Sequence, residues 1–429
     1  DFRDDDLEEN AVFVYDYNNN GYFNSDDYIL FYGESPHEWV YNASTTLFDY
    51  KDHLYSDECY YFLTIDQSSD GKRINYKPQI TNYTRIINSF NDYKFHESNF
   101  ENLIESGRDW YGERFGILDN QTFTFNFPDL VLNHPIHITT SVAARSLNSS
   151  FFTVNINSDF ISNINISNIV YDYATEYAKR ISNTQSYVSN SDQLDVELKY
   201  NYSENNAIGW LDRIELNARR SLRMNTSFLN FRDVESVGSL ELGKFEILNS
   251  NTSTTVWDVT DPKNVKMMNT SLNGSILSFI DSTTSLNHYC AFNNSFVKPS
   301  LLGKIENQNL HNISLDVNYV IISHPSFLSE ANRLLEIHEY YDNLNSIVVT
   351  PQQIYNEFSS GMQDVVAIRD FLRMLYKRQN SKLEYALLFG DGSYDNKNRI
   401  ANNTNFIPTF QSENSLSPVA SFVTDDFFA

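Results

Sequence analysis

The pattern of apolar residues changes once along this chain of 429 residues, at about Leu315, and no other feature constrains its fold as strongly. Before that point, β-branched and aromatic residues alternate with Ser, Asn and Asp. Three examples are QTFTFNF at 121–127, SSFFTVNIN at 149–157 and DVELKYNY at 195–202. A period of two places one face of each strand in a core and the other in solvent, so the pattern predicts antiparallel β-sandwich architecture.

One segment before Leu315 departs from the alternation. NIVYDYATEYAKRIS at 168–182 has apolar residues at a spacing that fits either a helix or an extended segment. The sequence alone leaves both interpretations open.

After about Leu315, short continuous apolar runs replace the alternation. Such runs are typical of strands that are buried on both faces of a sheet. The three runs are VNYVIISHP at 317–325, SIVVTP at 346–351 and EYALLFGD, which ends at Asp391.

Two segments with helical spacing separate these runs. The first segment places four residues on one face, with Ser326 in position to cap its N-terminus: Leu328, Ala331, Leu335 and His338. The second, DVVAIRDFLRMLYKR, forms one apolar stripe: Ile368, Phe371, Leu372 and Leu375. Strands that alternate with helices predict a parallel α/β unit.

The α/β unit is expected to be incomplete. A parallel sheet needs cover on both faces, yet no helical pattern follows Asp391. The chain also begins at Asp1 without an initiator Met, as expected of a processed chain or an excerpt. The sequence predicts three parts: a β-rich domain at 1–115, a β-sandwich domain at 116–315 and the first half of an α/β domain at 316–429.

The charge excludes one class of partner. Lys and Arg number 31 against 56 Asp and Glu, which gives a net charge of −25 and argues against nucleic acid as a ligand, because its phosphates would be repelled. No apolar run approaches the length of a membrane-spanning helix. The excess of carboxylates supplies oxygen ligands for hard cations such as Ca²⁺.

The segment DYNNNGYFNSDD at 16–27 fits a twelve-residue calcium loop. Its predicted ligands are Asp16, Asn18, Asn20, the carbonyl of Tyr22, Asn24 and Asp27, with Gly21 at the sharp bend. The twelfth position is Asp instead of the usual bidentate Glu, and AVFVY before the loop predicts a strand in place of a helix. We therefore expect a structural Ca²⁺ site in a strand-flanked loop; the alternative is an ordinary Asn-rich turn.

A second acidic segment, GDGSYD, follows the third parallel strand. Its spacing lacks the glycines and the helix start of a phosphate-binding loop, and Asp391 and Asp395 would repel an anion. Two carboxylates at a strand end suit a cation, whereas the alternative is a solvated turn.

The search for a nucleophile finds no catalytic residue. Cys59 and Cys290 lie in strand-like runs where a structural thiol is expected, and His288 near Cys290 has no orienting acid beside it. His134 and His137 lack further metal ligands. His324, which ends the first parallel strand, is expected to pack or to cap.

Many longer motifs identify a family resemblance that spans essentially the whole chain. They occur in the order seen in the sortases of type IX secretion systems, a family of gingipain-like cysteine peptidases from Bacteroidota. The motifs include SDECYYFLTID, GWLDRIELNARR, VWDVTDP, VIISHPSFLSEANRLLEIHE, VVTPQQIYNEFSSG, ALLFGDGSYD, FIPTFQSENS and TDDFFA. The resemblance implies a β-rich region followed by a caspase-like α/β domain at the extracellular face of the outer membrane.

The resemblance also implies an activity and its partners. In this family a Cys/His dyad cleaves the C-terminal sorting domain from cargo proteins through a thioester, and the cargo is attached to anionic lipopolysaccharide. Neither member of the dyad matches a position here, whereas Asp391 resembles a calcium-coordinating Asp of gingipains. The implied partners are the outer-membrane barrel PorV, other attachment-complex proteins and the sorting domains. The alternative is a calcium-stabilised surface binding module or adhesin without catalysis.

Overall fold

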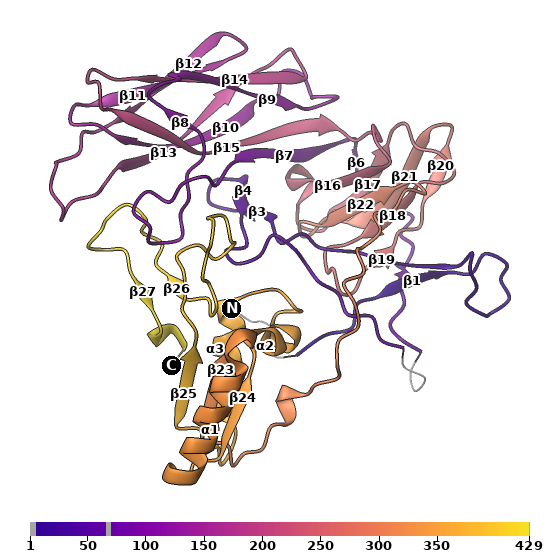
Figure 1. Cartoon of the computed structure of the whole chain (residues 1–429). Coiled ribbons are helices and arrows are strands. Elements are labelled where there is room, and N and C mark those ends of the chain that lie inside the picture. Colours follow the sequence, from indigo (N-terminus) through magenta and orange to yellow (C-terminus); the bar gives the residue numbers. More distant parts are fainter. Residues whose placement is uncertain (1–5, 66–69, 429) are drawn as a thin grey trace.

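The computed structural model describes residues 6–65 and 70–428. A large strand-rich region forms the upper part of Figure 1, and three helices around a small sheet form the lower part. The change of pattern at about Leu315 corresponds to this division. The expected β-rich region followed by a parallel α/β unit is therefore confirmed.

One long sheet runs through the β-rich region. Its nine strands in series are β13 (Lys179–Tyr187), β10 (Ile136–Arg145), β15 (Ile208–Ser221), β7 (Ser89–Glu97), β16 (Phe228–Arg232), β22 (His288–Phe292), β18 (Thr255–Asp258), β19 (Lys266–Met267) and β5 (Asn75–Tyr76), and β8 (Arg114–Phe115) pairs with β15. Most neighbours are antiparallel, as the alternating pattern predicts.

A four-stranded sheet packs on one end of the long sheet to form the first sandwich. Its strands, in order, are β12 (Asp159–Ile166), β11 (Ser150–Ile156), β14 (Gln193–Asn201) and β9 (Asn120–Asn126). The core between the sheets includes Phe152, Leu198, Leu211 and Ile214, all fully buried. The strands expected within 121–127, 149–157 and 195–202 are β9, β11 and β14.

A second four-stranded sheet packs farther along the same long sheet. Its strands, in order, are β20 (Ser271–Asn273), β21 (Ile276–Ser282), β17 (Leu242–Ile247) and β6 (Arg85–Ile87). The core here is aromatic, and Phe231, Phe245 and Tyr289 have ring centroids 5.0–6.1 Å apart. Strands from both sides of residue 115 contribute to the long sheet, so this sheet runs across the expected boundary at 115/116. The domain boundaries stay predictions.

Two hairpins and several short elements complete the β-rich region. The hairpins are β1 (Val12–Tyr15) with β2 (Tyr28–Phe31), and β3 (Glu38–Asn42) with β4 (Leu47–Lys51). Two 3₁₀ turns are η1 (Val234–Ser236) and η2 (Leu310–Asn312). The segment 168–182 forms no helix, because 168–178 is a loop and β13 begins at Lys179.

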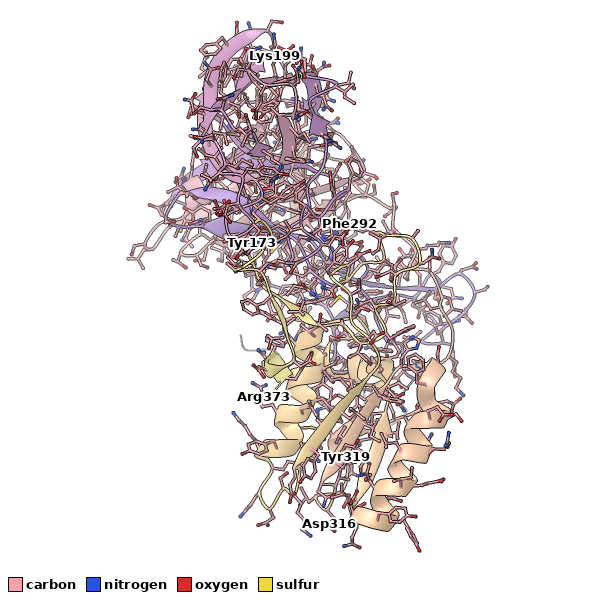
Figure 2. All side chains as sticks on the ribbon, turned by 60° about the vertical axis from the view of Figure 1, so that its left-hand side comes forward. Tyr173, Lys199, Phe292, Asp316, Tyr319 and Arg373 are labelled. Carbon is pink, nitrogen blue, oxygen red and sulfur yellow. The ribbon has the colours of Figure 1, made fainter. Side chains whose placement is uncertain are left out.

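The α/β unit is a three-stranded parallel sheet between helices. Its strands lie in the order β24 (Ser346–Val349), β23 (Tyr319–Ser323) and β25 (Tyr385–Phe389). The helices are α1 (Leu328–Asp342), α2 (Pro351–Phe358) and α3 (Val365–Lys377). Ala331 of α1 packs on one face of the sheet and the stripe of α3 on the other, as expected. Figure 2 places Tyr319 on this sheet and Arg373 on α3.

Two features of this unit differ from the sequence prediction. Helix α2 was not predicted; Thr350 and Gln353 form a capping box at its start, and Pro351 occupies its first turn. Ser326 does not cap α1, since it lies in η3 (Pro325–Phe327) and donates its backbone N–H to His324.

After β25 the chain folds back along the β-rich region. This part contains β26 (Phe410–Gln411), β27 (Val423–Thr424) and η4 (Asp426–Phe428). In both views it lies between the parallel sheet and the first sandwich (Figures 1 and 2). Within residues 6–65 and 70–428, no helix has the length and apolar character needed to cross a membrane.

Candidate functional site

The C-terminal edge of the parallel sheet brings together two segments that the sequence singled out. His324 follows β23, and Gly390 and Asp391 follow β25. The backbone N–H of His324 lies 3.4 Å from the carbonyl of Phe389, and a Cβ on Gly390 would lie 3.8 Å from that of His324. Ligands of open α/β sheets bind at this edge.

His324 packs and caps, as expected. Its Nδ1 accepts the backbone N–H of Ser326 at 3.3 Å. Its ring lies against Phe327 and Phe406, with centroids 6.0 and 4.8 Å away. These contacts fix the ring at the edge of the sheet.

The Gly-Asp-Gly turn after β25 is the docking point of a returning segment. The carbonyl of Asp391 accepts the N–H groups of Phe406 and Ile407 at 2.8 and 3.1 Å. A Cβ on Gly390 would lie 2.9 Å from Cβ of Phe406, and one on Gly392 would collide with the Thr409 side chain. Both glycines are therefore required for close packing, and the carboxylate of Asp391 remains exposed.

Asp395 does not form a solvated pair with Asp391. Its side chain is fully buried, and its oxygens accept the N–H groups of Ile400 and Lys397 at 2.7 and 3.2 Å. Arg399 lies 3.5 Å away. Asp395 thus organises the loop internally, and only Asp391 is exposed to bind a cation.

The loop 391–421 joins the parallel sheet to the β-rich region through a buried lysine. Lys397 is 3% exposed, and its Nζ lies 3.0 Å from both oxygens of Asp52 and 2.7 Å from Asp57. His37 Nδ1 lies 2.6 Å from Asp52. His37, Asp52 and Asp57 have the spacing of a metal site, but the ammonium already supplies the positive charge.

Further contacts extend this junction. Arg108 pairs with Glu413, the ring of Trp110 stacks on Tyr394 at 5.8 Å, and Arg399 lies 4.8 Å from Trp110. In addition, backbone groups meet directly where the N–H of residue 177 donates to the carbonyl of residue 416 at 2.7 Å. Sequence reasoning missed this junction because partners such as Lys397 and Asp52 are 345 positions apart.

A polar cleft of about 240 Å³ opens at the junction. Its lining includes Asp52, Glu97, Trp110, Asp212, Arg213 and Arg399. Burial and the nearby charges of Asp212 and Asp52 raise the pKa of Glu97 to about 7, although Arg213 opposes them. This carboxyl therefore changes charge near neutral pH.

The predicted calcium loop connects β1 and β2 and lies on the surface. Asp16 accepts the N–H groups of Asn20 and Gly21 at 3.2 and 2.8 Å, and Asp27 accepts those of Tyr17 and Asn24 at 2.8 and 2.5 Å. The two carboxylates therefore curl the loop, and Gly21 takes a φ of 75° at the bend.

Two other predicted ligand oxygens of the loop converge on a single point. The side-chain oxygen of Asn20 and the carbonyl of Tyr22 lie 3.2 and 3.0 Å from Nδ2 of Asn24. These two oxygens therefore accept the amide hydrogens of Asn24, while the carboxylates of Asp16 and Asp27 accept backbone N–H groups. The assignment of Ca²⁺ to Asp16, Asn18, Asn20, Tyr22, Asn24 and Asp27 stays a prediction.

Neither cysteine has an environment that favours a thiolate. Cys290 is buried in an apolar cluster, which raises its pKa, and burial together with Glu34 and Glu38 raises the pKa of Cys59 to about 11. Burial and Arg232 lower the pKa of His288 to about 3. A nucleophilic thiol needs the opposite environment.

A second cluster of residues with the spacing of a metal site connects η2 to α2 through hydrogen bonds. Glu357 of α2 accepts the backbone N–H of Leu310 at 2.7 Å and lies 2.6 Å from Nδ1 of His311. Asp6 is 3.8 Å from the same nitrogen. These bonds lower the pKa of Glu357 against the effect of burial and tie η2 to α2.

Comparisons with known proteins support this description of the fold. Residues 312–429 match the family model described as Peptidase family C25. The crystal structure of dimeric latent PorU from Porphyromonas gingivalis has a TM-score of 0.82 at 22% identity, over 99% of this chain and 41% of that chain. The resemblance expected from the sequence is confirmed: the chain has the fold of this gingipain-like peptidase and spans about two fifths of its length.

Other structural matches have TM-scores too low to support a conclusion about the fold. A carbohydrate-binding module CBM36 in complex with calcium and xylotriose has a TM-score of 0.19 at 10% identity, over 29% of this chain and 98% of that chain. The CBM36-1 domain of a xylanase from the hindgut metagenome of Trinervitermes trinervoides has a TM-score of 0.20 at 8% identity, over 29% of this chain and 96% of that chain. No curated protein matches the sequence.

Proposed function

We propose that this chain forms the β-rich region and the opening part of the peptidase domain of a type IX secretion sortase. One observation carries the proposal: a TM-score of 0.82 to PorU over 99% of the chain, together with the match of residues 312–429 to peptidase family C25. The parallel sheet presents its C-terminal edge, and the β-rich region holds the loop 391–421 that borders this edge.

The reaction would proceed by thiol chemistry that neither Cys59 nor Cys290 is placed to perform. A thiolate elsewhere in the protein attacks the peptide carbonyl before the sorting domain of a cargo protein. The C–N bond breaks, the sorting domain leaves as a protonated amine, and the cargo remains as a thioester. Water or an amine of anionic lipopolysaccharide then attacks this carbonyl and releases the thiol.

The proposed location is the extracellular face of the outer membrane in a bacterium of the Bacteroidota. The proposed partners are the barrel PorV, other attachment-complex proteins, anionic lipopolysaccharide and cargo sorting domains. The support is the resemblance to PorU, and the net charge of −25 argues against nucleic acid.

We propose that Ca²⁺ binds the loop between β1 and β2 and rigidifies this hairpin. The support is the spacing of oxygen-bearing residues from Asp16 to Asp27, with Gly21 at positive φ at the bend. Calorimetric titration with CaCl₂ is expected to give heat that Asp16→Asn abolishes. Asp26→Asn is the matched control, because Asp26 lies in the same loop outside the predicted ligand set. No heat from the original chain contradicts the assignment.

A thiol-probe experiment tests the proposed enzyme. The complete gene product that contains this chain is incubated with a cargo protein and with an iodoacetamide probe. Cleavage before the sorting domain, and labelling of a cysteine other than Cys59 and Cys290, are expected. The double variant Cys59→Ser/Cys290→Ala should retain both. Binding of cargo without cleavage or labelling favours the alternative, a calcium-stabilised adhesin without catalysis.

A further inference from the structure

A groove at the open side of the first sandwich lies between two strand edges. It has a volume of about 610 Å³ and is lined by residues 93–96 of β7 and 122–126 of β9. The strands belong to different sheets, so neither edge covers the other. Phe123 and Phe125 form an apolar floor, and Phe95 is 40% exposed at the rim.

The hydrogen-bond register shows which backbone groups of β9 are free. The N–H of residue 127 donates to the carbonyl of residue 192, and that of residue 200 to the carbonyl of residue 119. Both pairs continue the β9–β14 register, so the odd-numbered residues of β9 bond to β14. The N–H and C=O groups of Thr122, Thr124 and Asn126 therefore point away from β14 toward the groove.

This edge lacks the usual protection against pairing. Natural edge strands carry charges, prolines or bulges that prevent another strand from adding. β9 is Asn-Gln-Thr-Phe-Thr-Phe-Asn, and its register with β14 contains no irregularity. Within the described residues, β9 pairs with β14 alone.

The groove also has a distinctive charge. None of its nine described lining residues is acidic, although the chain as a whole carries −25. Nε2 of His96 lies 2.9 Å from the carboxylate of Glu113, which is outside the lining. Lys94 makes no ion pair among the described residues, and its ammonium lies 5.5 Å from the ring of Phe127. A carboxylate beside Lys94 would complete its interactions.

We propose that β9 binds an extended segment of a partner polypeptide by strand addition, with apolar side chains on the floor and a carboxylate beside Lys94. The outward backbone groups supply affinity, and the aromatic floor with Lys94 supplies selectivity. The site is independent of the peptidase chemistry, because it lies in the first sandwich and not at the edge of the parallel sheet.

The probe is the synthetic nonapeptide Ac-TVTETVTVT-NH₂, which places Val, Glu, Val and Val on one face of a strand. Binding to the chain is measured by fluorescence anisotropy of a labelled peptide. Replacing the Glu of the peptide with Lys is expected to weaken binding about tenfold or more, since a charge-assisted contact becomes repulsive.

Variants of the chain separate the contribution of the backbone N–H groups of β9 from that of the Lys94 charge. Thr124→Pro removes an outward N–H without removing a bond to β14, and should weaken binding about fivefold. Thr124→Ala is its matched control, because it removes the γ-methyl group and the hydroxyl that donates to Asp195 but keeps the backbone N–H. Lys94→Glu should abolish binding of the acidic peptide. Lys304→Glu, the same charge change at an exposed position between β22 and η2, outside the first sandwich, should not.

Several results would overturn the proposal. Absence of binding at millimolar peptide refutes it, as does binding that Thr124→Pro and Lys94→Glu leave unchanged while circular dichroism confirms their folding. Sedimentation tests the other occupant: if the chain dimerises and Thr124→Pro abolishes the dimer, the edge pairs with a second copy and the assigned partner is wrong.

Discussion

Replacement of Glu97 by Gln is expected to stabilise the protein above neutral pH. Glu97 lies in the junction cleft near Asp52 and Asp212, and burial with these two charges raises its pKa from 4.5 to about 7. The native state therefore holds a proton that the unfolded state has lost between these pH values. Because the pKa of Glu97 is higher in the folded state, the free energy of unfolding falls as the pH rises through this window. Gln keeps a similar shape and an oxygen acceptor for the neighbouring amide of Asn99.

The magnitude follows from the shift. A difference of about 2.5 pKa units at 1.36 kcal/mol per unit corresponds to about 3.4 kcal/mol when the carboxyl is fully ionised in both states. At pH 5 most of the native Glu97 is protonated, and the expected advantage of Glu97→Gln is about 1 kcal/mol. At pH 8 it should reach about 3 kcal/mol.

Urea unfolding at pH 5, 6, 7 and 8 measures this difference, with tryptophan fluorescence as the signal. Trp110 borders the same cleft and stacks on Tyr394, so its emission reports the opening of the junction. Glu336→Gln, at an exposed position of α1, is the matched control and should show no dependence on pH. An advantage of Glu97→Gln that fails to grow between pH 5 and pH 8 would refute the reasoning.

Three further substitutions test other parts of the fold, each by urea unfolding. Lys397→Met removes the ammonium between Asp52 and the exposed Asp57, leaves His37 as the remaining partner of Asp52, and should lower the free energy of unfolding by about 2 kcal/mol. Lys382→Met, at an exposed pair, should lower it by less than about 1 kcal/mol. Gly390→Ala should lower the free energy of unfolding by about 2–3 kcal/mol, because the new Cβ collides with Phe406. Gly303→Ala should lower it less, because Gly303 is also at positive φ but has no neighbour within 4 Å. Phe371→Ala should lower the free energy of unfolding by about 3–5 kcal/mol. Tyr376→Ala, on the exposed face of the same helix, should change it by no more than about 0.5 kcal/mol. Equal costs within any pair contradict the contacts assigned to that pair.

The parts of the fold that follow from side-chain periodicity could be predicted from the sequence. Alternation predicted β9, β11 and β14, and the stripe at Ile368 and Phe371 predicted α3, because one buried face determines both patterns. Helix α2 has only eight residues, so its stripe of Pro351, Ile354, Tyr355 and Phe358 covers just two turns. Its signal was the capping box of Thr350 and Gln353.

Contacts that a local pattern does not show decided the structure of one segment left open by the sequence and of one expected cap. Residues 168–182 contain enough apolar positions for a helix, yet the N–H of Tyr177 bonds to a carbonyl of the α/β unit, and β13 pairs with β10. Ser326 is a good cap in isolation, but the ring of His324 accepts its N–H and forms η3 instead. The order of the elements alone predicted that His324 and Asp391 lie at one edge of the sheet, because the carboxyl ends of parallel strands share an edge. Cation binding at Asp391 stays a prediction.

The junction explains how the β-rich region can influence that edge without contributing residues to it. Trp110 contacts Tyr394 and Arg108 contacts Glu413. Between these two positions, Phe406 and Ile407 donate their N–H groups to the carbonyl of Asp391. Phe406 in turn packs on the ring of His324. Each polar contact contributes about 1 kcal/mol, but they act on one continuous loop. The Gly-Asp-Gly turn and His324 are therefore linked through one loop to residues of the β-rich region that lie more than 200 positions away in the sequence.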